Sequence, residues 1–170
     1  TKMVASGNDF VVIGSSPQST VHSPQKIARE VCDRKYGIGA DGLLILEKSK
    51  SADVRMRIFN ADGSEAEMCG NGARCVALYF SRQSATFNPQ QKIRIQTKAG
   101  IIESVVNKDT VKIKLTEPKA LKFDIPIKVN GRGLKVNCIN TGVPHVVVFV
   151  EGLDKIDVFN LGRLIRYHKQ

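Results

Sequence analysis

Short apolar stretches bounded by turn residues dominate this sequence and predict β-strands. Such stretches occupy residues 9–14, 43–46 and 54–59, with glycine, asparagine or aspartate near their ends. Residues 91–116 alternate between apolar and polar positions, and two turn signals separate the alternating segments. Predicted strands therefore outnumber predicted helices, and no regular alternation of strand and helix links them. The pattern predicts an α+β fold.

Two stretches have helical periodicity instead. The first begins with Ser23 as an N-cap before a proline, and its apolar stripe runs to Cys32. The second covers residues 71–83 and is apolar over much of its circumference, which suits a helix that a sheet wraps around. Cys32 and Cys75 are expected to be buried beneath these helices. Residues 15–21 are expected to form a loop.

The chain just before the second helix carries the strongest candidate chemistry. Cys69 lies in the sequence Met-Cys-Gly-Asn-Gly, directly ahead of the helical pattern. Gly70 and Gly72 let the backbone approach a ligand closely, and the helix points unpaired N–H groups and its positive dipole end at the loop. A cysteine at a helix N-terminus ionises readily, because its pKa is lowered to roughly 3.5–7.5 from about 8.5.

Two interpretations of Cys69 follow from this position. Most cysteines are small buried hydrophobic residues, and Cys69 could be one of them. The other interpretation is a thiolate beside an anion-binding loop, and Asn60, Asn71 and the acidic turn at residues 61–64 favour it by converging on the same loop. Residues 37–42 lack the features of a nucleotide-binding loop, so a tight turn at the rim of the site is expected there.

The positive charge of the chain raises the alternative of a nucleic-acid-binding domain. The formal net charge is +10, and residues 91–135 hold 11 Lys and Arg against 4 Asp and Glu. Alternation at period two, as in residues 92–95 and 111–115, puts cations on one face of the predicted strands, and no aromatic residues interleave with those cations as base stacking requires. The segment therefore predicts a solvent-exposed sheet face, and no nucleic-acid partner is expected.

The cysteines and the apolar runs bear on cofactors and compartment. The four cysteines have neither metal-ligand spacing nor the spacing of a disulfide framework, which predicts no metal site and favours the reducing cytoplasm. No apolar run approaches the ~20 residues that a membrane-spanning helix needs, so no membrane partner is expected.

A degenerate internal repeat divides the chain. Residues 141–148 echo residues 6–13, and residues 160–166 parallel residues 26–32, in the same order of loop, apolar strand, loop and helix. The alternative is chance similarity of two short strand–helix units. A true repeat predicts an N-terminal domain over residues 1–117 and the beginning of a similar second domain over 118–170, with the second copy incomplete.

Five ordered motifs resemble the diaminopimelate epimerase family, and the resemblance covers nearly the whole chain. The motifs are Asn8-Asp9-Phe10, Cys32-Asp33-Arg34, and those at residues 37–42, 59–64 and 68–72. The resemblance implies a mixed, mostly antiparallel sheet wrapped around a central helix in each of two similar domains, with the active site in the cleft between them. Family proteins are longer than this chain.

The activity that the resemblance implies is epimerisation of LL-diaminopimelate to meso-diaminopimelate, in lysine and cell-wall precursor synthesis, without pyridoxal phosphate, metal or another cofactor. Inverting a stereocentre requires that one group removes the α-proton and an opposed group delivers another. The resemblance assigns both roles to cysteines. Cys69 is expected to be one of the two, so this chain is expected to be a half-site and inactive alone.

The remaining site residues are likewise implied by the resemblance. His145 is expected near the reacting centre, in a catalytic role; the alternative is a histidine that caps a strand entrance. The expected substrate-binding residues are Asn8, Asn60, Gly70 and Asn71. Val143 stands where family members often carry asparagine, which bears on recognition of the distal end of the substrate. A proline racemase-like enzyme is the nearest alternative, and a homodimer is compatible with either assignment.

Overall fold

A computed structural model gives the structure of the chain and describes residues 1–14, 22–83, 88 and 91–169. The chain divides into two compact units, Thr1–Thr116 and Glu117–Gln170, called unit 1 and unit 2 below. Each unit has a cluster of buried apolar side chains of its own. The loop expected at residues 15–21 lies outside the described residues.

Unit 1 is built on an eight-stranded sheet. Its strands are β1 Lys2–Ala5, β2 Asn8–Gly14, β3 Gly42–Glu47, β4 Val54–Asn60, β5 Glu65–Ala66, β6 Lys92–Thr97, β7 Gly100–Asn107 and β8 Thr110–Lys114. The strand order is β1-β2-β3-β4-β6-β7-β8, with β5 paired to β4. Only the β2–β3 and β4–β6 pairings among these are parallel. The sheet is mixed and mostly antiparallel, which confirms the predicted α+β class.

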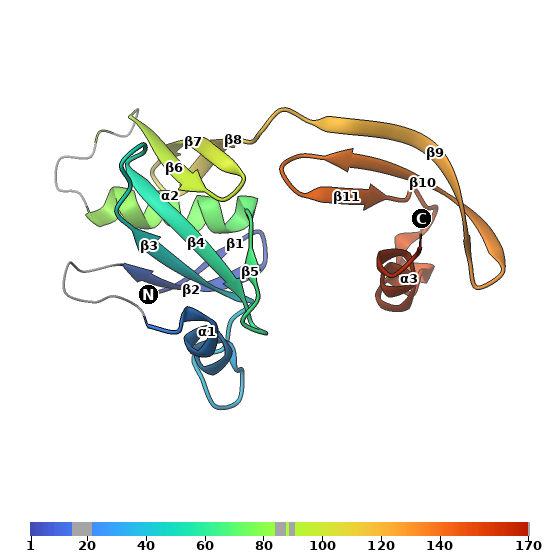
Figure 1. Cartoon of the computed structure of the whole chain (residues 1–170), viewed down its shortest axis with the longest axis horizontal. Coiled ribbons are helices and arrows are strands. Elements are labelled where there is room, and N and C mark those ends of the chain that lie inside the picture. The colour runs from blue at the N-terminus through green and yellow to red at the C-terminus, as the bar shows by residue number, and fades with distance from the viewer. Residues whose placement is uncertain (15–21, 84–87, 89–90, 170) are drawn as a thin grey trace. The chain divides into compact units, whose positions relative to one another are not determined.

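Helix α2, Gly70–Gln83, is the element around which the sheet curls (Figure 1). It contacts β1, β2, β3, β4, β6, β7 and β8. Its buried face is made of small residues, among them Gly72, Ala73 and Ala77, which allow strands to approach the helix axis. A Cβ added to Gly72 would lie 3.0 Å from the Leu44 side chain. The helix predicted over residues 71–83 is thus confirmed, together with its wrapping by the sheet.

Helix α1, Pro24–Cys32, covers the opposite face of strands β2, β3 and β4 (Figure 1). Side chains alternate between the two faces of a strand, so Leu43 and Ile45 pack under α1 while Leu44 lies beneath α2. This explains why β3 is a continuous apolar run: a helix covers each of its faces. Cys32 is buried in the α1 layer, as its place in the apolar stripe predicts.

Ser23 is the N-cap residue of α1, as predicted, but its side chain does not cap the helix. Ser23 has left-handed backbone angles (φ 55°, ψ 59°), and its side chain makes no capping hydrogen bond. Its carbonyl oxygen instead accepts hydrogen bonds from the N–H groups of Lys26 and Ile27. The Ser-Pro pattern located the start of the helix correctly but not the chemistry of its cap.

The turn after β4 packs against α1 and holds a glycine that no other residue can replace without strain. Gly63 has φ +85°, and a Cβ added there would lie 2.7 Å from the Gln25 carbonyl oxygen. The backbone of the turn is further fixed by Asp62, whose carboxylate accepts hydrogen bonds from the N–H and hydroxyl of Ser64. This rigid turn fixes the end of β4.

The sheet register places several predicted site residues at one edge. Strand β2 is parallel to β3 and β3 is antiparallel to β4, so the starts of β2 and β3 and the end of β4 coincide. In the register, Phe10 pairs with Gly42, and Gly42 pairs with Asn60. Asn8 opens β2 and Asn60 closes β4. The candidate site is therefore assembled at this edge.

The cationic stretch behaves as its alternation predicts. In β6 the exposed positions include Lys92 and Arg94, and they alternate with the buried residues Ile93 and Ile95. Lys92 forms an ion pair of 3.0 Å with Glu103 on the neighbouring strand β7. These cations thus lie on the solvent-exposed face of the sheet.

Unit 2 contains a three-stranded antiparallel sheet and a helix. Its elements are β9 Lys119–Val129, β10 Arg132–Asn140, β11 Pro144–Val147, the 3-10 helix η1 Leu153–Lys155 and α3 Val158–Arg166. The order is β11-β10-β9. The buried residues are Ile127, Val129 and Val136, with Leu161 and Ile165 of α3 packed against them. The sequence pattern predicted β11 and α3 but not the long β9–β10 hairpin.

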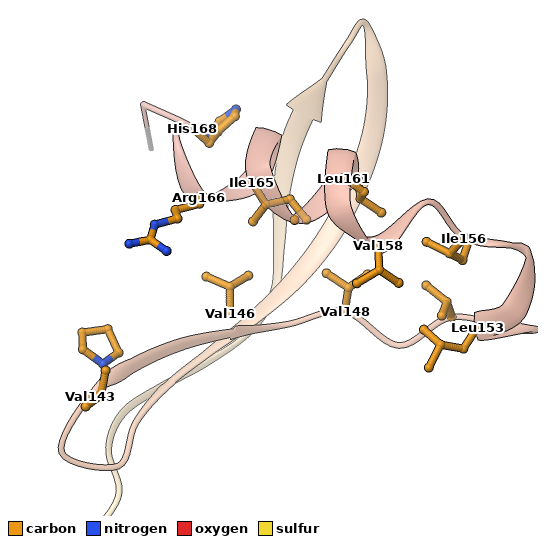
Figure 2. Close-up of a pocket in the computed structure, with 13 residues that line it drawn as sticks. Val143, Val146, Val148, Leu153, Ile156, Val158, Leu161, Ile165, Arg166 and His168 are labelled. Carbon is orange, nitrogen blue, oxygen red and sulfur yellow. The ribbon is translucent and has the colours of Figure 1, made fainter. Parts of the chain in front are cut away.

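An apolar groove lies between β11 and α3 and has a volume of about 770 Å³. Figure 2 shows Val146 and Val148 on the strand side facing Leu161 and Ile165 of the helix. Val158 extends the same wall (Figure 2). Helix α3 has no fully buried residue, although one of its faces is apolar. Unit 2 thus exposes an apolar surface that its own residues do not cover.

Candidate active site

Cys69 stands immediately before the first residue of α2 and caps the helix. Its carbonyl oxygen accepts the first intrahelical hydrogen bond, from the N–H of Ala73 at 2.8 Å. Its sulfur accepts a hydrogen bond from the N–H of Gly72 at 3.4 Å. An N-cap side chain ordinarily satisfies the third N–H of a helix with an oxygen, and here a sulfur does so. The predicted position of Cys69 at the helix N-terminus is confirmed.

The side chain of Asn8 faces this sulfur from the start of β2. Its Oδ1 lies 3.9 Å from Cys69 Sγ, and the thiol donates toward that oxygen. The same Oδ1 accepts a hydrogen bond from Nδ2 of Asn71 at 3.5 Å. Cys69 and Asn71 belong to the α2 segment and Asn8 to the sheet edge, so the fold brings together three residues that the sequence singled out.

Cys69 is half-buried, unlike the second cysteine of the same helix. Cys75 is buried at 2% exposure. Burial raises the pKa of Cys75 to about 11, and the nearby Cys69 contributes to the rise. Cys75 is therefore a core residue, as predicted, whereas the thiol of Cys69 at the N-cap of α2 is partly accessible.

Among the described residues, the hydrogen-bond partners of the Cys69 sulfur are Gly72 and Asn8, and neither Asn60 nor Gly70 is one of them. The side chain of Asn60 donates to the Ser64 hydroxyl at 2.9 Å, so it belongs to the turn after β4. A Cβ added to Gly70 would contact Ile113 and Leu115 at 3.5 and 3.8 Å. Their roles in substrate binding stay predictions.

His145 lies on β11 of unit 2, whereas Cys69 belongs to unit 1. Its side chain is exposed, and Nδ1 is 2.7 Å from the carbonyl oxygen of Val143. The catalytic role of His145 near the reacting centre stays a prediction.

A cluster of charged residues next to Asn8 was not assigned any role from the sequence. Arg34 donates two hydrogen bonds to Asp9, at 2.9 and 3.2 Å, and one to Asp41 at 2.8 Å. Lys2 forms a further ion pair with Asp9 at 3.2 Å. The Arg34 guanidinium holds the pKa of Asp9 well below its usual range. The three residues lie within the family-like motifs, but their spacing along the chain gave no sign that they meet.

Metal-binding and membrane-spanning features are absent from the part of the chain that the structure describes. No group of three or more His, Cys, Asp or Glu side chains is placed to hold a metal ion there. None of the helices formed by those residues combines the length and apolar character that crossing a bilayer requires. All four cysteines are free thiols.

Comparison with known proteins decides the family. The family model described as diaminopimelate epimerase matches residues 1–121. The chain belongs to the diaminopimelate epimerase family. A relative named diaminopimelate epimerase from Archaeoglobus fulgidus is 42% identical, over 98% of this chain and 63% of its own length. Another relative of that name, from Desulforudis audaxviator, is 39% identical, over 99% of this chain and 66% of its own length. The chain spans about two thirds of the length of these curated relatives.

Solved structures share the fold at lower identity. A phenazine biosynthesis protein of the PhzF family from Bacillus anthracis has a TM-score of 0.63 at 26% identity, covering 91% of this chain and 54% of its own. A probable proline racemase from Agrobacterium radiobacter has a TM-score of 0.67 at 16% identity, covering 92% and 50%. A hydroxyproline epimerase from Agrobacterium vitis has a TM-score of 0.65 at 18% identity, covering 95% and 52%. This chain and these three proteins thus share one mixed α+β architecture.

Proposed function

We propose that the whole protein interconverts LL- and meso-diaminopimelate by acid–base catalysis at one α-carbon, with Cys69 as one of two catalytic thiols and no cofactor. The observation that carries the proposal is the Cys69 sulfur at the N-terminus of α2, half-buried and facing Asn8, in a chain of the diaminopimelate epimerase family. The proposed activity belongs to lysine biosynthesis, and we propose a cytoplasmic location for the protein.

The surroundings of the sulfur suit a group that both gives and takes a proton. The Gly72 N–H, 3.4 Å from Sγ, stabilises a thiolate, and the Asn8 Oδ1, 3.9 Å away, accepts the proton of a thiol. Epimerisation needs both states, since the same cysteine is base in one direction and acid in the other. Each state thus has a hydrogen-bond partner in the structure.

Stabilising the reacting substrate is the second requirement. Removing an α-proton next to a carboxylate builds up negative charge, which hydrogen-bond donors in a dry site must stabilise. The first N–H groups of a helix have no intrahelical acceptor and attract anions. Gly70 and Asn71 open α2, and its first turn contains no acidic residue to compete. We assign them to the substrate α-carboxylate, and Asn8 and Asn60 to its amino and distal groups.

We further propose that residues 118–170 begin a second domain that supplies the opposed thiol, with His145 near the reacting centre. Two features support a repeat. The hairpins β1–β2 and β10–β11 both turn through a glycine with positive φ, Gly7 and Gly142. Helices α1 and α3 each have nine residues. The open groove of unit 2 supports further elements packing on it, as in a complete domain.

Deuterium incorporation tests the proposal. In D₂O, the full-length protein is expected to exchange the α-proton of diaminopimelate, and Cys69→Ala is expected to lower turnover by about 10²–10⁴-fold, the usual contribution of a positioned acid or base. Cys138→Ala, which alters a half-buried cysteine of unit 2, is the matched control and should keep its activity. The 170-residue chain alone should not turn over substrate. Activity of that chain alone, or of Cys69→Ala, would refute the two-thiol mechanism.

The substrate is tested by a second measurement. Proline and hydroxyproline are offered in the same exchange assay, because enzymes of similar fold carry those names. Exchange of diaminopimelate alone supports the proposal. Exchange of the cyclic imino acids in preference to diaminopimelate would contradict it and favour a proline racemase-like function.

A further inference from the structure

A chain of hydrogen bonds runs from the charged cluster to the Cys69 sulfur. Asp41 Oδ2 accepts a hydrogen bond from Asn8 Nδ2 at 2.8 Å and another from the backbone N–H of Asp9 at 3.1 Å. Asn8 then presents its remaining amide atom, Oδ1, to Cys69 at 3.9 Å. The carboxylate and the sulfur therefore contact opposite ends of one amide group.

The orientation of that amide follows from the chemistry of its partners. A carboxylate only accepts hydrogen bonds, so the end of Asn8 that faces Asp41 must be the NH₂ group. On the other side, Arg74 donates to Oδ1 of Asn71, and a guanidinium only donates. Asn71 therefore also directs its NH₂ group toward Asn8 Oδ1, at 3.5 Å. If the Asn8 amide were flipped, its oxygen would face the Asp41 carboxylate and its NH₂ group would face the NH₂ group of Asn71. Neither pair can form a hydrogen bond.

Asp41 is itself held in place on several sides. Arg34 bridges its Oδ1 to the carboxylate of Asp9, so the two neighbouring anions share one cation. The backbone N–H of Asp41 donates to Asp9 Oδ1 at 2.9 Å. Lys2, which pairs with Asp9, also donates to the carbonyl oxygen of Gly39 in the same loop. The loop that carries Asp41 is thereby tied to the start of β2.

We propose that Asp41 is a positioning residue of the active site: it locks the Asn8 amide so that Oδ1, and not the NH₂ group, faces the Cys69 sulfur. The lock keeps an acceptor beside the thiol proton, while Gly72 remains the donor to the sulfur. Asp41 touches neither the sulfur nor a substrate group and acts through Asn8. The importance of the lock for catalysis rests on the proposed function, but its existence is measurable without substrate.

The first experiment uses the isotope-labelled 170-residue chain in solution. A scalar coupling across the hydrogen bond from Asn8 Nδ2 to Asp41 Cγ is expected, together with slowed exchange of the Asn8 side-chain amide protons. Absence of the coupling and exchange as fast as that of a free amide would overturn the proposal. Because no diaminopimelate is present, this result is independent of whether the protein is an epimerase.

The second experiment measures carboxamidomethylation of Cys69 by iodoacetamide, with each cysteine followed by peptide mass spectrometry. Asp41→Asn lets Asn8 rotate and present an N–H to the sulfur, which is expected to raise the Cys69 rate about threefold to tenfold relative to Cys138. Asp109→Asn is the matched control, because it removes a carboxylate of unit 1 that pairs with exposed Arg82 at 2.7 Å. It should leave the Cys69 rate unchanged.

The reactivity of buried Cys75 distinguishes two causes of a faster Cys69 reaction: rotation of the Asn8 amide and unfolding of unit 1. Cys75 lies in α2, the helix that Cys69 caps, and stays unreactive as long as unit 1 is packed. A faster Cys69 with a silent Cys75 supports the proposal, and an unchanged Cys69 in the folded variant overturns it. Should Cys75 react as well, the variant is unfolded, and the coupling in the unsubstituted chain decides.

Discussion

Units 1 and 2 use similar elements but differ in how completely they are covered. In unit 1 a sheet encloses α2 and carries α1 on its other face, and large side chains such as Phe59 and Leu44 are fully buried. Among the described residues of unit 2, three strands and α3 bury only Ile127, Val129 and Val136, while Phe159 and other large apolar side chains are exposed. Unit 1 has a helix at the centre of its sheet, and unit 2 has an apolar groove. In unit 1 the central helix covers the apolar face of the sheet, whereas in unit 2 an apolar face stays open.

The largest expected effect comes from truncating matched phenylalanines in the two units. Phe59→Ala removes a fully buried ring beneath α1 and should lower the free energy of unfolding by about 3–5 kcal/mol. Phe159→Ala on α3, where the side chain is 78% exposed, should change it by less than about 0.5 kcal/mol. Urea unfolding followed by circular dichroism measures both. Equal losses would contradict the contrast between the units.

A pH titration of the free energy of unfolding tests the contribution of ion pairs to the stability of unit 1. Ion pairs with Arg57 and Lys98, at 2.8 and 2.7 Å, hold the pKa of Glu65 at about 2, against an ordinary 4.5. Because the folded pKa is the lower one, the stabilisation is present above pH 4.5 and is lost as the pH falls toward 2. Glu65→Gln should cost up to about 3 kcal/mol at neutral pH and flatten the loss of stability over that window.

The control for this titration is Glu103→Gln, which removes an exposed pair with Lys92. Exposed pairs contribute less than about 1 kcal/mol, so the acid slope should barely change. An unaltered slope in Glu65→Gln would show that another carboxylate governs the acid limb.

A smaller effect is expected from the turn that fixes β4. Gly63→Ala forces a side chain into a left-handed conformation and toward the Gln25 carbonyl oxygen, which should cost about 1–3 kcal/mol. Gly131→Ala, in the β9–β10 turn of unit 2, has a similar φ of +78° but open space around the added Cβ. The same urea assay compares them, and the stability of unit 1 should fall only in Gly63→Ala.

The smallest expected effect concerns the groove of unit 2. An apolar fluorescent dye such as ANS should bind the 170-residue chain there, because the groove is open and lined mainly by aliphatic side chains. Val146→Ser makes one wall polar and should reduce the fluorescence by about half without changing the unfolding of unit 1. Undiminished fluorescence would place the dye elsewhere.

Much of unit 1 was predictable because local pattern and tertiary environment agree there. The local sequence of several elements matches their surroundings in the fold. Examples are the apolar run of β3, the turn residues between β6, β7 and β8, and the apolar helix α2. The β9–β10 hairpin was not predicted, since β9 is exposed over most of its length and lacks a clean alternation of buried and exposed positions. Periodicity cannot indicate a strand over the part of its length where neither face is buried, and in β9 only the end, at Ile127 and Val129, is buried.

In the candidate site, too, the contacts between residues close in sequence were predictable, and the contacts between distant segments were not. Cys69 and Asn71 are nearly adjacent in the chain, at the start of α2, so the sequence alone showed them together. The contact of Asn8 with Cys69 spans 61 positions and required the family-like motifs to be noticed. The bonds among Asp9, Arg34 and Asp41 join three separate segments through side chains, and nothing in the spacing of those segments encodes them.

Strand β3 separates two packed layers with a single thickness of backbone. Leu43 belongs to the layer under α1 and Leu44 to the layer under α2, yet they are consecutive residues. A substitution that shifts this strand toward one helix moves it away from the other. Enlarging one side chain and trimming its neighbour should therefore give strongly non-additive free energies of unfolding, so unit 1 should tolerate change at β3 best as coupled pairs of mutations.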